Sequence, residues 1–211
     1  YSTKAKGSVG RMKLEDFNDF LDQIFKFFPT NNLAKRIKKI ITTAYKDKFT
    51  LAGATRSLIH QLFGDKGLII IDPDSHDLKK MFSSYMEDEL INNTCQECVN
   101  KTVKSIKEVY SEKYIPQVNP REINLFHLNV NSRERIIRKG SKYILSDKNL
   151  PQKEMLNELN KRPENFSPNV LMRPLFQEVI LPNLCYIGGP SEMSYWLELK
   201  SFFDYHGVVF P

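Results

Sequence analysis

Apolar residues recur every three or four positions along the first 66 residues of the chain. This spacing predicts three helices, over residues 13–28, 33–48 and 50–67. Pro29 ends the first helix, and Gly64 or Gly67 closes the third. Lysines occupy the side of the second helix opposite its apolar stripe. We therefore expect residues 1–66 to form a helical segment.

Two short apolar runs are typical of buried strands. Leu68–Ile71 lies between a glycine and an Asp-Pro-Asp turn, and Leu184–Ile187 runs into Gly-Gly-Pro. Runs joined through helices need a right-handed crossover, so we expect them to be neighbouring parallel strands. The sequence thus predicts an α/β fold, containing part of a parallel sheet.

The sequence between the two runs predicts helical and hairpin insertions. One long helix is expected over 75–110, with a kink near Ile-Asn-Asn-Thr or a departure from the core. A small antiparallel hairpin insertion is expected over 121–150, turning at Gly140-Ser141. Shorter helices are expected over 152–160, from Pro168, and over 190–205.

Composition and charge narrow the class of protein. With 41% hydrophobic and 27% charged residues, the chain has the composition of an ordinary globular protein. It has neither a membrane-length apolar run nor a signal peptide, which predicts a cytoplasmic location. Residues 1–66 hold 13 Lys/Arg against 6 Asp/Glu. A solvated helix face over 33–48 explains this local basicity, so we expect no nucleic-acid or membrane partner.

The cysteines and histidines do not form a recognisable metal or catalytic motif. Cys95 and Cys98 have the spacing of a zinc pair, but no second pair exists and both lie on an apolar stripe. We expect core thiols and no metal site. The four histidines are dispersed, without a catalytic triad order. The chain begins at Tyr1 and stops after an apolar run, so we expect a piece of a longer protein.

Polar residues at the ends of the two predicted strands are candidates for a binding site. Asp72 and Asp74 follow the first run, where they either face a ligand crevice or end the strand and cap the next helix. Gly188 and Gly189 follow the second run and precede a helix N-terminus, which suits a phosphate or carboxylate. Glu192 complements that helix dipole or binds an amine.

A polar stripe precedes the second run. Asn169, Arg173 and Gln177 are spaced four apart, so in a helix they share one face. The segment around Arg173 is apolar enough to be buried, and a buried guanidinium needs an anionic partner. This partner is either an internal acid, such as Glu178 or Glu192, or a ligand.

Three long segments resemble the bacillithiol biosynthesis cysteine-adding enzymes. They read SPNVLMRPLFQEVILPNLCYIGGPSEMSYWLELK, ATRSLIHQLFGDKGLIIIDPD and QVNPREINLFHL. The resemblance runs along nearly the whole chain, in order, and its paired motifs NV-x-x-RP-x-x-QE and Y-x-GGP-x-E-x-x-YW are long and unusual. It implies a Rossmann-like core with helical insertions and a coiled-coil helix. Residues 67–211 would then be a Rossmann-like half-domain.

The resemblance also implies an activity. Cysteine would be joined through its carboxyl group to the amine of glucosaminyl-malate, which implies ATP as co-substrate; magnesium and a homodimer stay open. Two alternatives stay open as well, a non-catalytic interaction module and a nucleotidyl-transferase-like enzyme on the same fold. The resemblance implies a site drawn from nine residues: Asp72, Asp74, Asn169, Arg173, Gln177, Gly188, Gly189, Glu192 and Tyr195.

Several features of that family are missing from the sequence. Family members are more than twice as long, and their Gly-Gln-Gln segment, Glu-Asp-His-Asp segment and C-terminal coiled coil are absent. Ser75-His76 also replaces the residues that usually follow the Asp-Pro-Asp turn. Because half of the crevice would be missing, we expect the chain to be inactive by itself.

Overall fold

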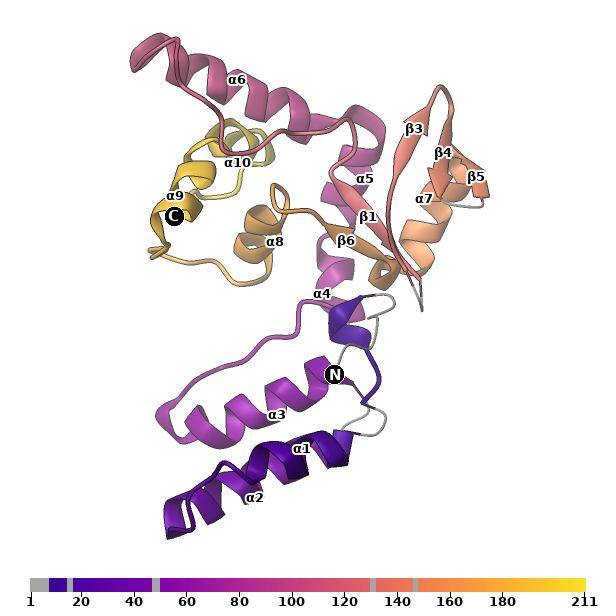
Figure 1. The fold of residues 1–211 in the computed structure, drawn as a ribbon. Helices are drawn as coiled ribbons and strands as arrows, with labels where there is room; N and C mark the ends of the chain where they lie inside the picture. Colours follow the sequence, from indigo (N-terminus) through magenta and orange to yellow (C-terminus); the bar gives the residue numbers. More distant parts are fainter. Residues whose placement is uncertain (1–7, 15–16, 47–49, 130–131, 146–147) are drawn as a thin grey trace. The chain divides into compact units, whose positions relative to one another are not determined.

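The computed structural model describes residues 8–14, 17–46, 50–129, 132–145 and 148–211, which form two compact units (Figure 1). The first unit takes in Tyr1–Pro73 and Asn129–Arg133. The second takes in Asp74–Leu128 and Glu134–Pro211.

The first unit is built from the predicted helices. Its elements are η1 (Val9–Arg11), α1 (Phe17–Phe25), α2 (Asn32–Lys46), α3 (Leu51–Phe63) and η2 (Gly64–Lys66). The Asn31 side chain accepts from the Ala34 amide at 2.8 Å, and Thr50 accepts from the Gly53 amide at 3.2 Å. These bonds satisfy amides that the first turns of α2 and α3 leave without helical partners.

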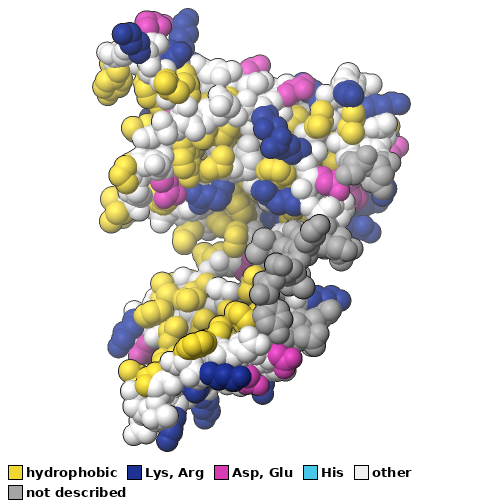
Figure 2. Space-filling view, in the orientation of Figure 1, with side chains coloured by type: hydrophobic (Ala, Val, Ile, Leu, Met, Phe, Trp, Pro, Cys, Tyr) yellow, Lys and Arg dark blue, Asp and Glu magenta, His cyan; other side chains and the backbone are white. Residues whose placement is uncertain are grey.

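The predicted strand over Leu68–Ile71 is wrong. These residues follow η2 without regular secondary structure, and Ile69 is 83% exposed. A strand buried on both faces needs neighbouring strands on both sides and layers above and below, and the described residues of this unit place none beside it. Exposed hydrophobic side chains are visible on both units in Figure 2.

In the second unit three helices replace the long helix expected over 75–110. They are α4 (His76–Met81), α5 (Ser83–Asn92) and α6 (Thr94–Val109). Phe82 separates the first two, and Asn93 separates the last two with φ 54° and ψ 36°. Asparagine tolerates this left-handed conformation, so the break falls inside the Ile-Asn-Asn-Thr segment.

The remaining elements of this unit alternate between strands and helices. They are β1 (Leu125–Leu128), β2 (Arg133–Arg135), β3 (Ile137–Lys139), β4 (Lys142–Leu145), β5 (Lys148–Pro151), α7 (Gln152–Lys161), η3 (Pro163–Asn165), β6 (Phe166–Pro168), α8 (Arg173–Ile180), α9 (Pro190–Leu197) and α10 (Lys200–His206). The described chain therefore combines helices and strands, as an α/β protein does. The helix expected over 190–205 is divided into α9 and α10.

Three described strand pairs, β1–β6, β3–β4 and β4–β5, are antiparallel, which differs from the predicted parallel sheet. One sheet has the order β2-β1-β6, with β1 and β6 antiparallel, and the other has the order β3-β4-β5. β3 and β4 form a hairpin around Gly140-Ser141, where the sequence predicts a turn, and Gly140 has φ 59°. The same insertion also contributes β1, which pairs with residues about forty positions later in the chain.

The predicted strand over Leu184–Ile187 is wrong as well. This segment lies between α8 and α9 without regular structure, and Leu184 and Ile187 are 103% and 93% exposed. Only Tyr186 of this run turns inward, where its ring stacks on Trp196 with 4.0 Å between centroids. The segment is thus held to the unit by one aromatic side chain.

The core of the second unit lies among its helices and the inner strand faces. Fully buried side chains include Phe82, Met86, Leu90, Tyr143, Met155, Phe166, Trp196, Phe202 and Phe203. α10 packs beside α6 (Figure 1). Cys95 and Cys98 belong to this core, which confirms the prediction of core thiols, and burial raises the pKa of both. Within the described ranges, no helix is long and apolar enough to cross a membrane.

Candidate functional site

The start of α8 is set by Asn169 and Pro174. The predicted helix from Pro168 begins five residues later, at Arg173, with Pro174 in its first turn. Before it, Asn169 Oδ1 accepts from the amides of Leu171 at 2.9 Å and Met172 at 3.2 Å. Asn169 therefore holds the turn before the helix, whose N-cap is Met172, and the expected helical stripe is reduced to Arg173 and Gln177.

Arg173 is the centre of a polar cluster. Its Nη2 donates to Glu192 Oε1 at 3.1 Å and to Tyr195 Oη at 3.0 Å, and its Nη1 donates to Gln177 Oε1 at 3.2 Å. Tyr186 Oη donates to the same Glu192 oxygen at 2.5 Å. We call Arg173, Gln177, Tyr186, Glu192 and Tyr195 the Arg173 cluster.

The cluster brings together three segments of the chain. Arg173 and Gln177 come from α8, Tyr186 comes from the segment before Gly188, and Glu192 and Tyr195 come from α9. Of the two internal acids proposed for Arg173, Glu192 is the partner. Glu178 is instead buried and accepts from the amide of Asn183 at 2.8 Å.

The cluster lies at the surface, so the expectation of a buried Arg173 is wrong. The Arg173 side chain is 44% exposed and that of Glu192 is 34% exposed. Pro174, Leu175 and Phe176 of the same turn fill the core instead, which leaves Arg173 on the outer side of α8. An ion pair this exposed contributes about 0–1 kcal/mol to stability, so stability alone gives little reason for it.

Hydrogen bonds set the ionisation of the cluster. The hydrogen bond from Tyr186 lowers the pKa of Glu192, and the Arg173 guanidinium lowers it further. Burial and the bond to Glu192 raise the pKa of Tyr186. At neutral pH the cluster therefore presents one guanidinium, one carboxylate and a Tyr186 phenol that is still protonated.

The two glycines have different surroundings. A Cβ on Gly188 would lie 3.0 Å from Tyr186 Cε1 and 3.3 Å from Met193 Sδ, so this position is crowded. A Cβ on Gly189 would meet nothing within 4 Å. Gly189 is also the N-cap of α9, and its carbonyl accepts from the Met193 amide at 2.9 Å. The backbone at Gly189 is thus open to a ligand, whereas Gly188 is needed for packing.

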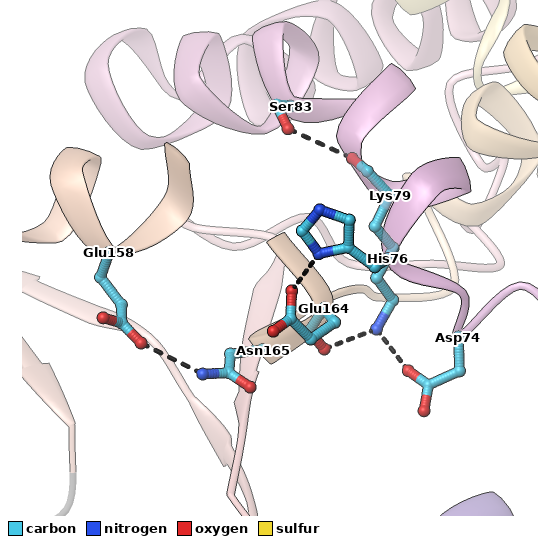
Figure 3. Close-up of polar contacts among 7 residues, drawn as sticks. All are labelled: Asp74, His76, Lys79, Ser83, Glu158, Glu164 and Asn165. Atoms are coloured by element: carbon cyan, nitrogen blue, oxygen red, sulfur yellow. Dashed lines mark hydrogen bonds and ion pairs between the residues drawn. The ribbon is translucent and has the colours of Figure 1, made fainter. Parts of the chain in front are cut away.

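Asp74 contacts a buried lysine (Figure 3). Lys79 Nζ donates to Asp74 Oδ1 at 2.5 Å and to the Glu164 carbonyl at 2.9 Å, and the Lys79 side chain is only 4% exposed. Ser75, rather than Asp74, is the N-cap of α4, and no side chain bonds there. Asp74 is therefore neither a helix cap nor an isolated ligand group, because it neutralises Lys79.

His76 extends this group of residues. Its Nδ1 lies 2.7 Å from Glu164 Oε2, so η3 is bonded to α4 through both a side chain and a carbonyl (Figure 3). Asp72 belongs to the first unit, where it lines a hollow of about 340 Å³ together with Ile59 and Ile71. Among the described residues, no group of three or more His, Cys, Asp or Glu could hold a metal ion.

Sequence reasoning missed three polar residues that organise the site. Tyr186 was assigned to a strand, but its hydroxyl bonds Glu192. Glu89 and Asn124 are fully buried and bonded to each other at 2.9 Å through the Asn124 amide. Asn124 stands between apolar residues in EINLF, whereas Glu89 follows two other acids in MEDELI. A polar residue between apolar neighbours is a signal that would have marked Asn124, whereas the local sequence does not distinguish Glu89 from the acids beside it.

Comparison with known proteins places this chain in the Rossmann-like class. Residues 1–211 match the family described as bacillithiol biosynthesis BshC, N-terminal Rossmann-like domain. The chain belongs to the BshC family.

Curated relatives agree with this assignment. A protein of Flavobacterium johnsoniae named "Putative cysteine ligase BshC" is 45% identical over 213 residues, which cover 100% of this chain. Proteins of the same name from Flavobacterium psychrophilum and Bacillus cytotoxicus are 43% and 30% identical, again over 100% of this chain. The chain spans only 39% of the Flavobacterium johnsoniae protein.

Proposed function

We propose that this chain is part of an ATP-dependent carbon–nitrogen ligase that adds cysteine to glucosaminyl-malate in bacillithiol biosynthesis. Membership of the BshC family and the names of its relatives support the ligase class. The Arg173 cluster is the structural observation that supports the site. It presents a guanidinium, a carboxylate and two phenols at one exposed place, where their contribution to stability is small.

The reaction needs groups that hold opposite charges. The amide joins the carboxyl carbon of cysteine to the amine nitrogen of glucosaminyl-malate, and one carboxyl oxygen leaves bonded to a phosphorus atom of ATP. We assign anionic groups to Arg173, because a guanidinium binds carboxylate or phosphate through two parallel hydrogen bonds. The open backbone at Gly189, at the N-terminus of α9, would take part of the same charge.

Glu192 is assigned to the amine. Its pKa is lowered, first by the hydrogen bond from Tyr186, so it remains ionised and is a poor proton acceptor. A persistent carboxylate suits the binding of an ammonium group better than general base catalysis. Tyr195 and Gln177, which bond Arg173, would fix the orientation of the guanidinium.

The cluster fits an anionic co-substrate, although the chain has no P-loop or GxGxxG motif. ATP supplies the phosphoryl or nucleotidyl group that makes the carboxyl oxygen a leaving group. Magnesium would arrive with the nucleotide, because the described residues contain no cluster of metal-binding side chains. A cytoplasmic location is part of the proposal, since it provides ATP and agrees with three free cysteines.

Substitution of Arg173 in the full-length protein tests the proposal. In Arg173→Ala, amide formation from cysteine and glucosaminyl-malate, followed by mass spectrometry, should fall by at least about a hundredfold. The midpoint of thermal unfolding should be nearly unchanged, because the ion pair is exposed.

Arg138→Ala is the matched control. Arg138 also donates to a glutamate, Glu122, at 2.9 Å, but it lies on β3 outside the cluster. We expect this variant to keep its activity. Full activity in Arg173→Ala would reject the ligase site and favour a non-catalytic interaction module.

A further inference from the structure

A buried carboxylate is linked to the start of α8 through the side chains of two asparagines. Glu89 of α5 is 0% exposed, yet no lysine or arginine neutralises it in the contacts that the structure describes. Instead its Oε2 accepts from the Cys95 amide at 2.9 Å, and its Oε1 accepts from the amide of Asn124 at 2.8 Å. Burial of a carboxylate is costly without such donors, so Glu89 is held in one orientation by backbone groups.

Asn124 continues the connection toward α8. Its Nδ2 donates to Glu89 Oε1 at 2.9 Å and to the Arg121 carbonyl at 2.7 Å. Its Oδ1 accepts from the Arg121 amide at 3.1 Å and from Asn169 Nδ2 at 2.8 Å. Both donors and both acceptor sites of the side chain are therefore used. Aspartate would lose the donors and repel Glu89, and leucine would leave several buried groups unpaired.

Asn169 is held by Asn124 at two points. Besides the side-chain bond, the Asn169 amide donates to the Asn124 carbonyl at 2.9 Å. Asn169 in turn accepts from the amides of Leu171 and Met172 with its side chain, and from the Arg173 amide at 2.9 Å with its carbonyl. Each bond fixes the group that makes the next one. We call the buried Glu89 and Asn124, together with the partly buried Asn169, the relay.

We propose that Glu89 and Asn124 are positioning residues for Arg173, acting through Asn169. The inference rests on the proposed function, in which Arg173 binds an anionic group. Arg173 is the first residue of α8, and its amide is held by the Asn169 carbonyl while the Asn169 side chain holds the two amides of the turn just before it. The relay anchors this turn to the core, so the direction of the Arg173 side chain depends on residues that never touch a ligand.

The position of Arg173 matters because binding groups act at short range. A displacement of about 1 Å can reduce the rate of an enzyme by about a hundredfold. Loss of one link of the relay should move the turn by less than that. We therefore expect a reduction of about tenfold in kcat/KM, without a direct effect on the other members of the cluster.

The test combines two relay variants with Arg173→Lys in the full-length protein. Asn124→Ala removes the side-chain links, and Glu89→Gln is a milder change that keeps one acceptor. In both variants, hydrogen exchange of the amides of Leu171, Met172 and Arg173 should be about tenfold faster than in the parent. Each relay substitution should lower kcat/KM about tenfold when made in the parent protein. In the Arg173→Lys background the same substitution should lower kcat/KM less than about twofold, because the relay acts only through Arg173.

Thr102→Val is the matched control. Thr102 Oγ1 also makes buried bonds, with the Cys98 carbonyl at 3.2 Å and the Ser201 amide at 3.1 Å, but it joins α6 to α10. Loss of the Thr102 hydroxyl should change neither hydrogen exchange at residues 171–173 nor kcat/KM. The proposal is overturned if exchange at residues 171–173 is unchanged, or if the loss of kcat/KM is the same in both backgrounds. If exchange accelerates while Arg173→Lys alone is fully active, the relay stands and the proposed function of Arg173 fails.

Discussion

Lys79 Nζ and Asp74 Oδ1 lie 2.5 Å apart, with the lysine almost completely buried and the aspartate 31% exposed. Loss of one partner from such a pair leaves a charge in the core, which costs about 3–5 kcal/mol when both groups are buried. Asp74→Asn should therefore lower the free energy of unfolding by about 2–3 kcal/mol in urea titrations, less than for a fully buried pair.

Lys79→Met is the informative companion to Asp74→Asn. It fills the same space without a charge and leaves the Asp74 carboxylate partly in water, so a smaller loss of stability is expected. Equal losses in both variants would contradict this account. A variant Asp74→Asn that is stable but inactive would show instead that Asp74 binds a ligand.

Glu89 makes stability depend on pH. Burial raises its pKa from 4.5 to about 7, and the nearby Asp88 carboxylate contributes to the increase. The folded chain then binds a proton more tightly than the unfolded chain. The free energy of unfolding should fall as pH rises from 4.5 to 7, by up to about 3 kcal/mol at about 1.4 kcal/mol per pH unit.

His127 and His206 act in the opposite direction, because burial lowers the pKa of both. The measurement is therefore the difference between the parent and Glu89→Gln in urea unfolding between pH 4.5 and 8. The variant should lack the part of the slope that comes from Glu89. Parallel curves for the two proteins would show that Glu89 does not titrate in this range.

Gly188 and Gly189 should respond differently to alanine. At Gly188 the new Cβ would press on the Tyr186 ring at 3.0 Å, so Tyr186 must move away from Trp196 and Glu192. We expect a loss of about 1–3 kcal/mol in thermal unfolding. At Gly189 there is space, and its φ of −69° suits alanine, so stability should be unchanged or slightly higher.

Kinetic measurements on Gly189→Ala test whether a ligand binds against the backbone of Gly189. If a ligand approaches its backbone, Gly189→Ala should reduce ligand affinity at least about tenfold while leaving the fold intact. Unchanged kinetics in the full-length protein would place the ligand elsewhere. Ser191→Ala, an exposed change in the same turn, controls for general effects on α9.

Cys185 reports on the surroundings of the segment 184–187. It is the exposed cysteine, whereas Cys95 and Cys98 are buried. Mass spectrometry of alkylated peptides from the 211-residue chain should therefore show fast modification of Cys185 alone. In the full-length protein we expect slower modification, because other parts of the polypeptide would cover this apolar run. Equal rates in the two proteins would show that the segment is exposed in both.

The 211-residue chain should bind the proposed substrates weakly. The Arg173 cluster is open to water on its outer side, so each polar contact with a ligand competes with solvent. We expect dissociation constants no tighter than about 1 mM for ATP, cysteine or glucosaminyl-malate, which corresponds to about −4 kcal/mol. Calorimetric titration decides this, and micromolar binding would show that the site is complete within the chain.

Local patterns account for the elements that the sequence predicted well. The helices α1, α2, α3 and α7 follow from apolar spacing, and the turn at Gly140-Ser141 follows from its composition. These features depend on interactions between residues close in sequence. The runs 68–71 and 184–187 were mistaken for strands of one sheet. Their apolar content indicates that they need burial, but it does not show which neighbouring strands or helices would bury them.

The sequence also predicted only part of the candidate site. The four-residue spacing of Asn169, Arg173 and Gln177 identified Arg173 as a candidate. Glu192, its observed partner, was one of the two internal acids proposed for it. The burial of Arg173 was predicted wrongly, because the apolar neighbours of a helical residue can fill the core while the residue itself faces water. The bonds from Glu89 to Asn124 join positions 35 residues apart, and no local pattern contains such a pairing.

The partly exposed apolar runs 68–71 and 184–187 affect how the chain behaves in solution. Each presents apolar side chains next to backbone groups that belong to no sheet of the described residues. Such segments are templates for pairing between separate molecules. Expressed by itself, the chain should self-associate as its concentration rises. Leu184→Lys or Ile69→Lys would oppose this by charge repulsion, and light scattering would measure the decrease in self-association.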